Sequence, residues 1–219
     1  MSRHWIALLL ALTLISVSAE MALATTVMQG SLPEVLGVAA YAFAGTVDSM
    51  NVALTDGVVV THIHFSRLEW AKGAWSGDTL TLRQSGGIHG GKSYGVVGSP
   101  GFDLGRRYII LARKGLGSPP HFLPIIGIWQ GFYPLQYDST ASGMVVANEK
   151  GWPLVGFRNH HPIILLPPDL RRSPPPSYTD EQLAQAIVEY RSEDPGTRVS
   201  EEEFLAELRR LMPAELEKK

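Results

Sequence analysis

The sequence contains no cysteine among its 219 residues. Disulfides and lipid attachment through cysteine are therefore excluded, and the fold must be stabilised by burial alone. The chain also lacks the HExxH and GxSxG motifs and any Ser/His/Asp set in a recognisable context. Our leading interpretation therefore includes no catalytic residue, no cofactor and no metal.

Neither sign of charge is in large excess, since 19 basic and 21 acidic residues give a formal net charge of −2. Residues 25–176 carry nine acids and twelve bases, a balance of +3, and residues 177–219 carry eleven acids and six bases, a balance of −5. Neither balance is large enough to indicate nucleic acid as a partner. The asymmetry indicates that two different pieces are joined.

Long apolar runs are limited to the N-terminus. Arg3 supplies a positive start, Trp5–Val17 is apolar, and Ala22-Leu23-Ala24 is a small-x-small cleavage site, with Ala19 as an alternative. The run is shorter than the ~20 residues that a spanning helix needs. We predict a signal peptide over 1–24, a periplasmic or secreted protein, and no stable membrane insertion after cleavage.

The following residues, 25–166, have the pattern of a mainly β domain that begins with a short helix at Ser31. Predicted strands run from Tyr41 towards Leu54 and over Val58–Trp70, Thr79–Arg83, Arg107–Arg113, Ile125–Tyr133, Gly143–Ala147 and Trp152–Phe157. Thr55-Asp56-Gly57 is a hairpin turn signal between the first two, and Arg107–Arg113 is apolar on both sides. In the second strand, apolar alternation slips between Phe65 and Leu68, which predicts a β-bulge near Ser66-Arg67. A bent strand of this kind favours a small closed or partly open barrel. The spacing of the strands is that of an all-β barrel or sandwich. The glycine-dense segment from Ser85 to Gly95 reads as a flexible loop, because no helix pattern follows it to make a phosphate site.

Composition changes again after residue 166. Residues 167–177 form a proline-rich linker, and residues 178–219 are predicted to form a helical hairpin. Its helices begin at the capping boxes Thr179–Gln182 and Ser200–Glu203. We predict a mobile tail whose two helices close on each other rather than on the barrel.

A set of glycines and strand residues carries a family resemblance over about residues 31–157. The set comprises Ser31–Glu34, Ala44–Val47, Thr61, Ile63, Phe65, Leu68, Lys72-Gly73, Gly77–Leu82, Gly91, Gly98–Pro100, Phe102, Gly105, Tyr108–Leu111 and Gln130–Phe132. It resembles an uncharacterised exported bacterial family with an OB-like barrel similar to that of tissue inhibitors of metalloproteinases. The resemblance implies fold and export. Those inhibitors chelate a protease zinc through an N-terminal cysteine, whereas this chain has Thr25 there, so their mechanism does not carry over.

Four histidines are the candidate metal-ligating residues. His62 and His64 are two apart on a predicted strand and share a face, and His160 and His161 precede Pro162. Two imidazoles begin a zinc or copper site, which needs at least a third ligand. A metal-binding protein or metal-dependent hydrolase is therefore the alternative to surface histidines.

Other weak candidates are Trp129, as an aromatic binding residue, and His89, as a proton shuttle in the glycine segment. Ser192–Phe204 faintly matches a calcium loop, but Thr197 stands where its glycine is needed. The leading prediction is a non-catalytic, exported binding module. Its partner is expected to be another exported protein, with a protease as one candidate.

Overall fold

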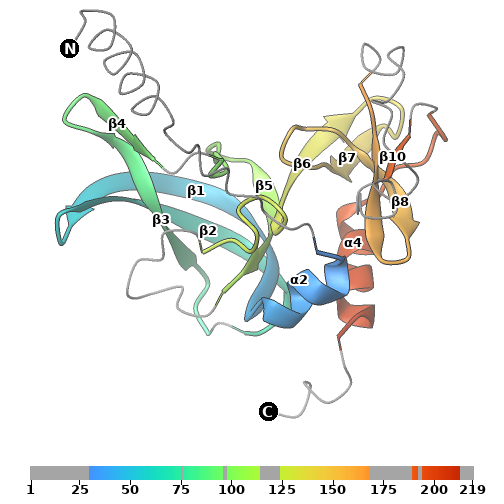
Figure 1. Ribbon diagram of the computed structural model, residues 1–219, viewed down its shortest axis with the longest axis horizontal. Helices are drawn as coiled ribbons and strands as arrows, with labels where there is room; N and C mark the ends of the chain where they lie inside the picture. The colour runs from blue at the N-terminus through green and yellow to red at the C-terminus, as the bar shows by residue number, and fades with distance from the viewer. Residues whose placement is uncertain are drawn as a thin grey trace, which may run out of the picture.

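The computed structural model describes residues 30–74, 76–95, 98–113, 124–167, 189–191 and 194–212. The described helices are α2 (Leu32–Val38) and α4 (Glu201–Arg210), and the strands are β1 (Tyr41–Thr55), β2 (Val58–Lys72), β3 (Leu80–His89), β4 (Lys92–Gly95), β5 (Arg107–Ala112), β6 (Phe132–Asp138), β7 (Gly143–Val146), β8 (Leu154–Arg158), β9 (His161–Leu165) and β10 (Glu189–Arg191) (Figure 1). The predicted mainly β class is confirmed.

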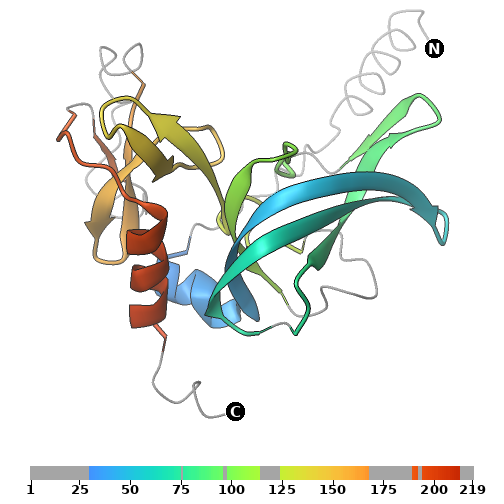
Figure 2. The same ribbon diagram turned by 180° about the vertical axis from the view of Figure 1, so that it is seen from behind.

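Seven strands form one antiparallel sheet in the order β4-β3-β2-β1-β5-β6-β7. A smaller sheet has the order β10-β9-β8, in which β9 pairs parallel with β10 and antiparallel with β8. β1 and β2 are 15 residues each and form a long arched hairpin (Figure 2). No ladder among the described strands joins β4 to β7, so the large sheet is described as curved and open. Neither described helix has the length and hydrophobicity needed to cross a membrane.

The predicted bulge in β2 is confirmed. Ala44 pairs with Glu69 and Thr46 with Ser66, so two residues of β2 lie opposite one residue of β1. Arg67, the first of the two, has a φ of 49°. Further register shifts follow Ala42 and Val47. Each unpaired residue increases the local twist, which is why the hairpin arches.

Two hydrophobic cores lie on opposite sides of β5. Tyr108 and Ile110 face the aromatic core, whose buried residues are Phe43, Val47, Ile63, Phe65, Leu80, Leu82, Tyr108, Ile110, Ala112, Ile125 and Phe132. Ile109 and Leu111 face the helical core, to which α2 contributes Leu32, Val35 and Leu36 and α4 contributes Phe204, Leu205 and Leu208. The apolar pattern of β5 on both sides, noted in the sequence, therefore reflects burial in two cores.

The second tail helix is confirmed as α4, and the Ser200–Glu203 capping box is present. The prediction that the tail stands free of the sheet is wrong for α4. Phe204 and Leu208 are fully buried in the helical core. Just before α4, the Val199 N–H donates to the Leu154 carbonyl and the Val199 carbonyl accepts from the Val146 N–H, both at 2.9 Å.

Ion pairs also hold α4 to the large sheet. Arg107 of β5 donates from Nε to both oxygens of Glu201, at 2.7 and 2.9 Å, and Arg209 donates to Glu69 of β2 at 2.9 Å. Most of the predicted first tail helix lies outside the described residues. Its last two residues, Glu189 and Tyr190, are the start of β10 rather than a helix end.

The glycine segment is a strand and a hairpin rather than a flexible loop. β3 continues through Gly86 and Gly87, whose φ angles are 108° and 135°, and Gly90-Gly91 turns the chain into β4. A Cβ on Gly87 would lie 2.7 Å from the Thr61 hydroxyl, so only glycine lets β3 cross β2 this closely. The spacing of glycines thus reflects close backbone approach.

Two further parts of the sheet differ from the prediction. Most of Ile125–Tyr133 is a turn, in which Gly127 has a φ of 59°, and β6 begins only at Phe132. β9 was not predicted, because His161 and Pro162 open a strand of only five residues. Proline is tolerated at the start of a strand, so composition alone was misleading there.

Candidate interaction surface

The outer half of the β1–β2 hairpin arches away from α2 and α4 (Figures 1 and 2). We call residues 49–62 the arm. None of its residues belongs to a hydrophobic cluster in the described part of the chain, but Val59 and Val60 are buried, at 7% and 0% exposed. At its tip Asp56 and Gly57 have φ angles of 51° and 78°, which matches the predicted two-residue hairpin turn.

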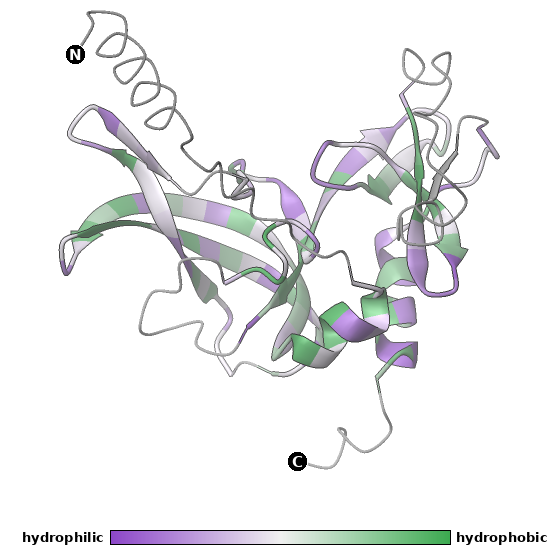
Figure 3. Ribbon diagram, viewed as in Figure 1, coloured by the Kyte–Doolittle hydropathy of each residue, from purple (hydrophilic) through white to green (hydrophobic). Residues whose placement is uncertain are grey.

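One side of the arm carries three exposed apolar side chains. Met50, Val52 and Leu54, the apolar strip, are 36%, 37% and 58% exposed. Met50 pairs with Ile63, which is buried in the aromatic core, so the strip continues that core outward on the same side of the sheet. Figure 3 shows hydrophobic and hydrophilic residues alternating along β1 and β2. The alternation is visible in the sequence. The sequence does not reveal that β3 crosses this side, where a Cβ on Gly87 would lie 2.9 Å from Val52, or that Met50, Val52 and Leu54 nevertheless stay partly exposed.

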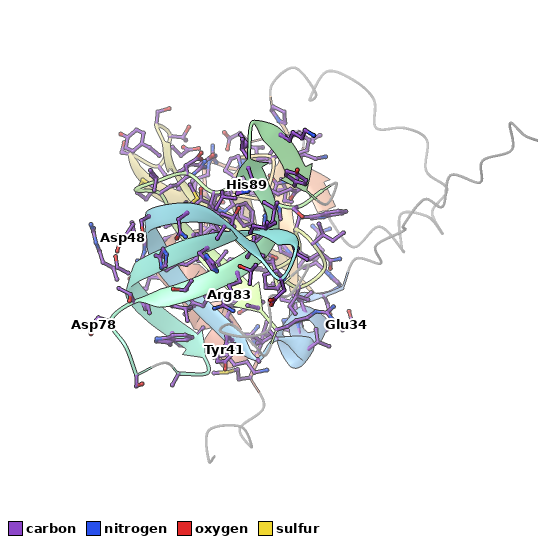
Figure 4. All side chains as sticks on the ribbon, turned by 90° about the vertical axis from the view of Figure 1, so that its left-hand side faces the viewer. Glu34, Tyr41, Asp48, Asp78, Arg83 and His89 are labelled. Atoms are coloured by element: carbon purple, nitrogen blue, oxygen red, sulfur yellow. The ribbon has the colours of Figure 1, made fainter. Side chains whose placement is uncertain are left out.

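The opposite side of the arm carries His62 and the buried Val60, and His64 continues this side just beyond the arm. The Nε2 of His64 lies 2.9 Å from the Asn51 Oδ1, and its Nδ1 lies 2.9 Å from the Thr81 hydroxyl. The Nδ1 of His62 lies 3.3 Å from the Asn51 Nδ2. Burial, together with the positive charge of Arg83 (labelled in Figure 4) and the neighbouring His64, lowers the pKa of His62. Both imidazoles thus lie within hydrogen-bond distance of the neutral side chains Asn51 or Thr81 on the sheet surface.

The four predicted histidines do not converge. His160 lies at the β8–β9 turn, where its Nδ1 is 3.4 Å from a Glu207 carboxylate oxygen and 3.3 Å from an Arg210 nitrogen of α4. His161 begins β9. Among the described residues, no group of three or more His, Asp or Glu side chains is arranged to hold a metal. The alternative metal-dependent function therefore has no third ligand in this part of the chain.

The remaining candidates lie on other elements than the arm. Trp129 is half-buried in the turn before β6, with its ring near Gly98. His89 is exposed at the end of β3 and pairs with Lys92 of β4. In the faint calcium loop, the Asp194 carboxylate accepts from Arg198 and the Glu203 carboxylate caps α4, so neither is directed at a cation.

Two surface hollows, of about 530 and 520 Å³, each contain an ion pair within the chain. In the hollow between α4 and β8, Arg210 donates to Glu207 and holds the pKa of that carboxyl below its usual value. In the hollow beside β6, Arg106 donates to Asp103. These two ion pairs lie within the chain, whereas Met50, Val52 and Leu54 of the apolar strip stay 36%, 37% and 58% exposed.

Comparison with known proteins adds no assignment, because no family model, curated protein or solved structure matches the chain.

Proposed function

We propose that this chain is an exported, non-catalytic interaction module that holds another exported protein against its arm. The observation that carries the proposal is the apolar strip, which prolongs the buried row of Ile63 and Phe65 into solvent. Covering an exposed valine or leucine side chain completely is worth about 1.5–3 kcal/mol. A contiguous exposed apolar surface beside polar residues is typical of protein interaction sites.

Two features of the chain support the wider proposal. The segment 1–24 has the charge, apolar run and cleavage site of a signal peptide, which directs the protein to the periplasm or out of the cell. The arched, bulged β1–β2 pair within a curved antiparallel sheet supports an OB-like architecture. By the family resemblance, a protease is one candidate partner. The arm would then act as the contact surface and the two cores as its rigid support.

The test places a photo-crosslinking amino acid at Leu54, in the strip, and in a control protein at Tyr137, which is 68% exposed on β6. Both proteins are made in the producing cells and irradiated in place. We expect an adduct with one other exported protein from position 54 that is absent from position 137 and is lost with Val52→Asp. Equal adducts from both positions, or none from position 54, would refute the proposal. An adduct with a second copy of the chain would also refute it.

A further inference from the structure

One edge of β1 is unpaired along the arm. β5 pairs with β1 only from Tyr41 to Thr46, and the last backbone bonds on that side join Val47 to Gly105 and Arg106. From Ser49 to Thr55, β1 pairs with β2 on one side and with no described strand on the other. Most of these residues are exposed. An unpaired strand edge presents a row of backbone donors and acceptors that another strand can pair with.

We propose that the partner binds by strand addition: an extended segment of about eight residues pairs with the free edge of β1. This inference rests on the proposed function and specifies its mode. The segment would place apolar side chains on the side of the apolar strip. Its alternate side chains would be polar, because Ser49, Asn51 and Ala53 line the other side of β1 with small or polar groups.

The charges at the ends of the edge specify the partner further. Asp48 (labelled in Figure 4) and Asp56 are both exposed and stand at the two ends of the free segment. Eight residues of strand at ~3.3 Å each separate them by about 26 Å. A segment with lysine or arginine at both ends therefore complements the edge.

The same charges disfavour a second copy of this chain as the occupant. Antiparallel self-pairing over the whole edge, centred on Val52, would place Met50 opposite Leu54, which is favourable. It would also place Asp48 of each copy opposite Asp56 of the other, and like charges opposite each other destabilise a strand pair. The edge is therefore suited to a different, basic-ended chain.

The experiment uses the chain from Thr25 to Lys219 and a displayed library of nine-residue peptides. The probes carry Val, Ile, Leu or Phe at even positions, Thr, Ser or Asn at inner odd positions, and Lys or Arg at both ends. Two matched libraries serve as controls. One replaces the Lys or Arg at both ends by Glu or Asp. The other replaces the inner odd residues by Pro, which removes their backbone N–H donors. We expect enrichment from the first library only, and about tenfold weaker binding when the ends of a selected peptide are changed to Glu.

Two protein variants make the result specific. Asp48→Lys with Asp56→Lys should reverse the preference towards acid-ended peptides, whereas the control Asp78→Lys with Glu149→Lys, which changes the net charge equally, should not. Hydrogen exchange should show new protection at alternate amides between Ser49 and Thr55. The inference is overturned if proline peptides bind equally, if the variants do not differ, or if protection falls elsewhere.

The remaining outcomes separate this inference from the proposed function. Peptide selection without enrichment, alongside a specific adduct at position 54, overturns strand addition and leaves the interaction module standing. Failure of both experiments overturns both. Concentration-dependent dimerisation with protection of Ser49–Thr55 in the absence of peptide would show that a second copy occupies the edge and would refute a basic-ended partner.

Discussion

Truncating Phe204 should test whether α4 is part of the folded core. The side chain is fully buried, and its ring centroid lies 4.6 Å from that of Tyr133 on β6 and 5.7 Å from that of Phe157 on β8. Phe204→Ala removes both ring contacts and leaves a cavity between the two sheets and the helix. Substitutions of this kind cost about 3–5 kcal/mol. We therefore expect a loss of about 4 kcal/mol, a large fraction of the ~5–15 kcal/mol that stabilises a typical domain.

For a chain of this size, each kcal/mol lowers the melting temperature by roughly 2–4 °C, so the variant should melt roughly 8–16 °C lower. The assay is urea unfolding followed by both tryptophan fluorescence, which reports on the sheets, and far-ultraviolet circular dichroism. Both signals should shift together in one transition. Glu202→Ala, at an exposed position of the same helix, is the control and should cost about 0.5 kcal/mol.

The reasoning fails if the sheets keep their unfolding midpoint in Phe204→Ala while the helical signal is lost separately at low urea. That result would make the tail an independent unit that merely lies beside the sheet. A loss below about 1 kcal/mol in both signals would also contradict it, because no well-packed buried phenylalanine is removed so cheaply.

Three further results are expected. Gly131→Ala should destabilise the fold by more than about 1–3 kcal/mol in urea unfolding, because its Cβ would lie 2.5 Å from the Leu111 carbonyl oxygen; a neutral effect would contradict this close approach. Since the pKa of His62 is lowered from 6.5, the unfolded chain takes up this proton first as pH falls, so stability should decrease below about pH 6.5 and His62→Gln should reduce that slope in melting-temperature measurements; an unchanged slope would refute the assignment. Mass spectrometry of the exported protein should place its first residue at Thr25, and a retained N-terminus would contradict export by cleavage.

Sequence patterns were most informative where structure depends on near neighbours. The turn at Asp56-Gly57, the bulge at Arg67 and the Ser200 capping box were all predicted, because each is decided by a few adjacent residues. The turn before β6 was misread as a strand, since Gly127 and Gly131 serve tight backbone geometry that apolar neighbours conceal.

The candidate site was only partly predictable. His62 and His64 do share a face, as the period of a strand requires, but His160 contacts α4 instead of completing a ligand set. The apolar alternation of Met50 and Val52 was readable as a strand. Its significance depends on which strands lie beside and above it, and that information is spread over residues far apart in the chain.

By itself, the sequence determined the mainly β class, the amphipathic helix that became α4 and the alternating faces of the arm, because propensity, capping and side-chain period act over a few residues. Only the tertiary structure decided that α4 is buried, through Phe204 and the Arg107–Glu201 pair, and that Met50, Val52 and Leu54 of the arm stay partly exposed. Burial depends on contacts between distant segments. The same apolar pattern therefore lies in a core in α4 and faces solvent at Leu54.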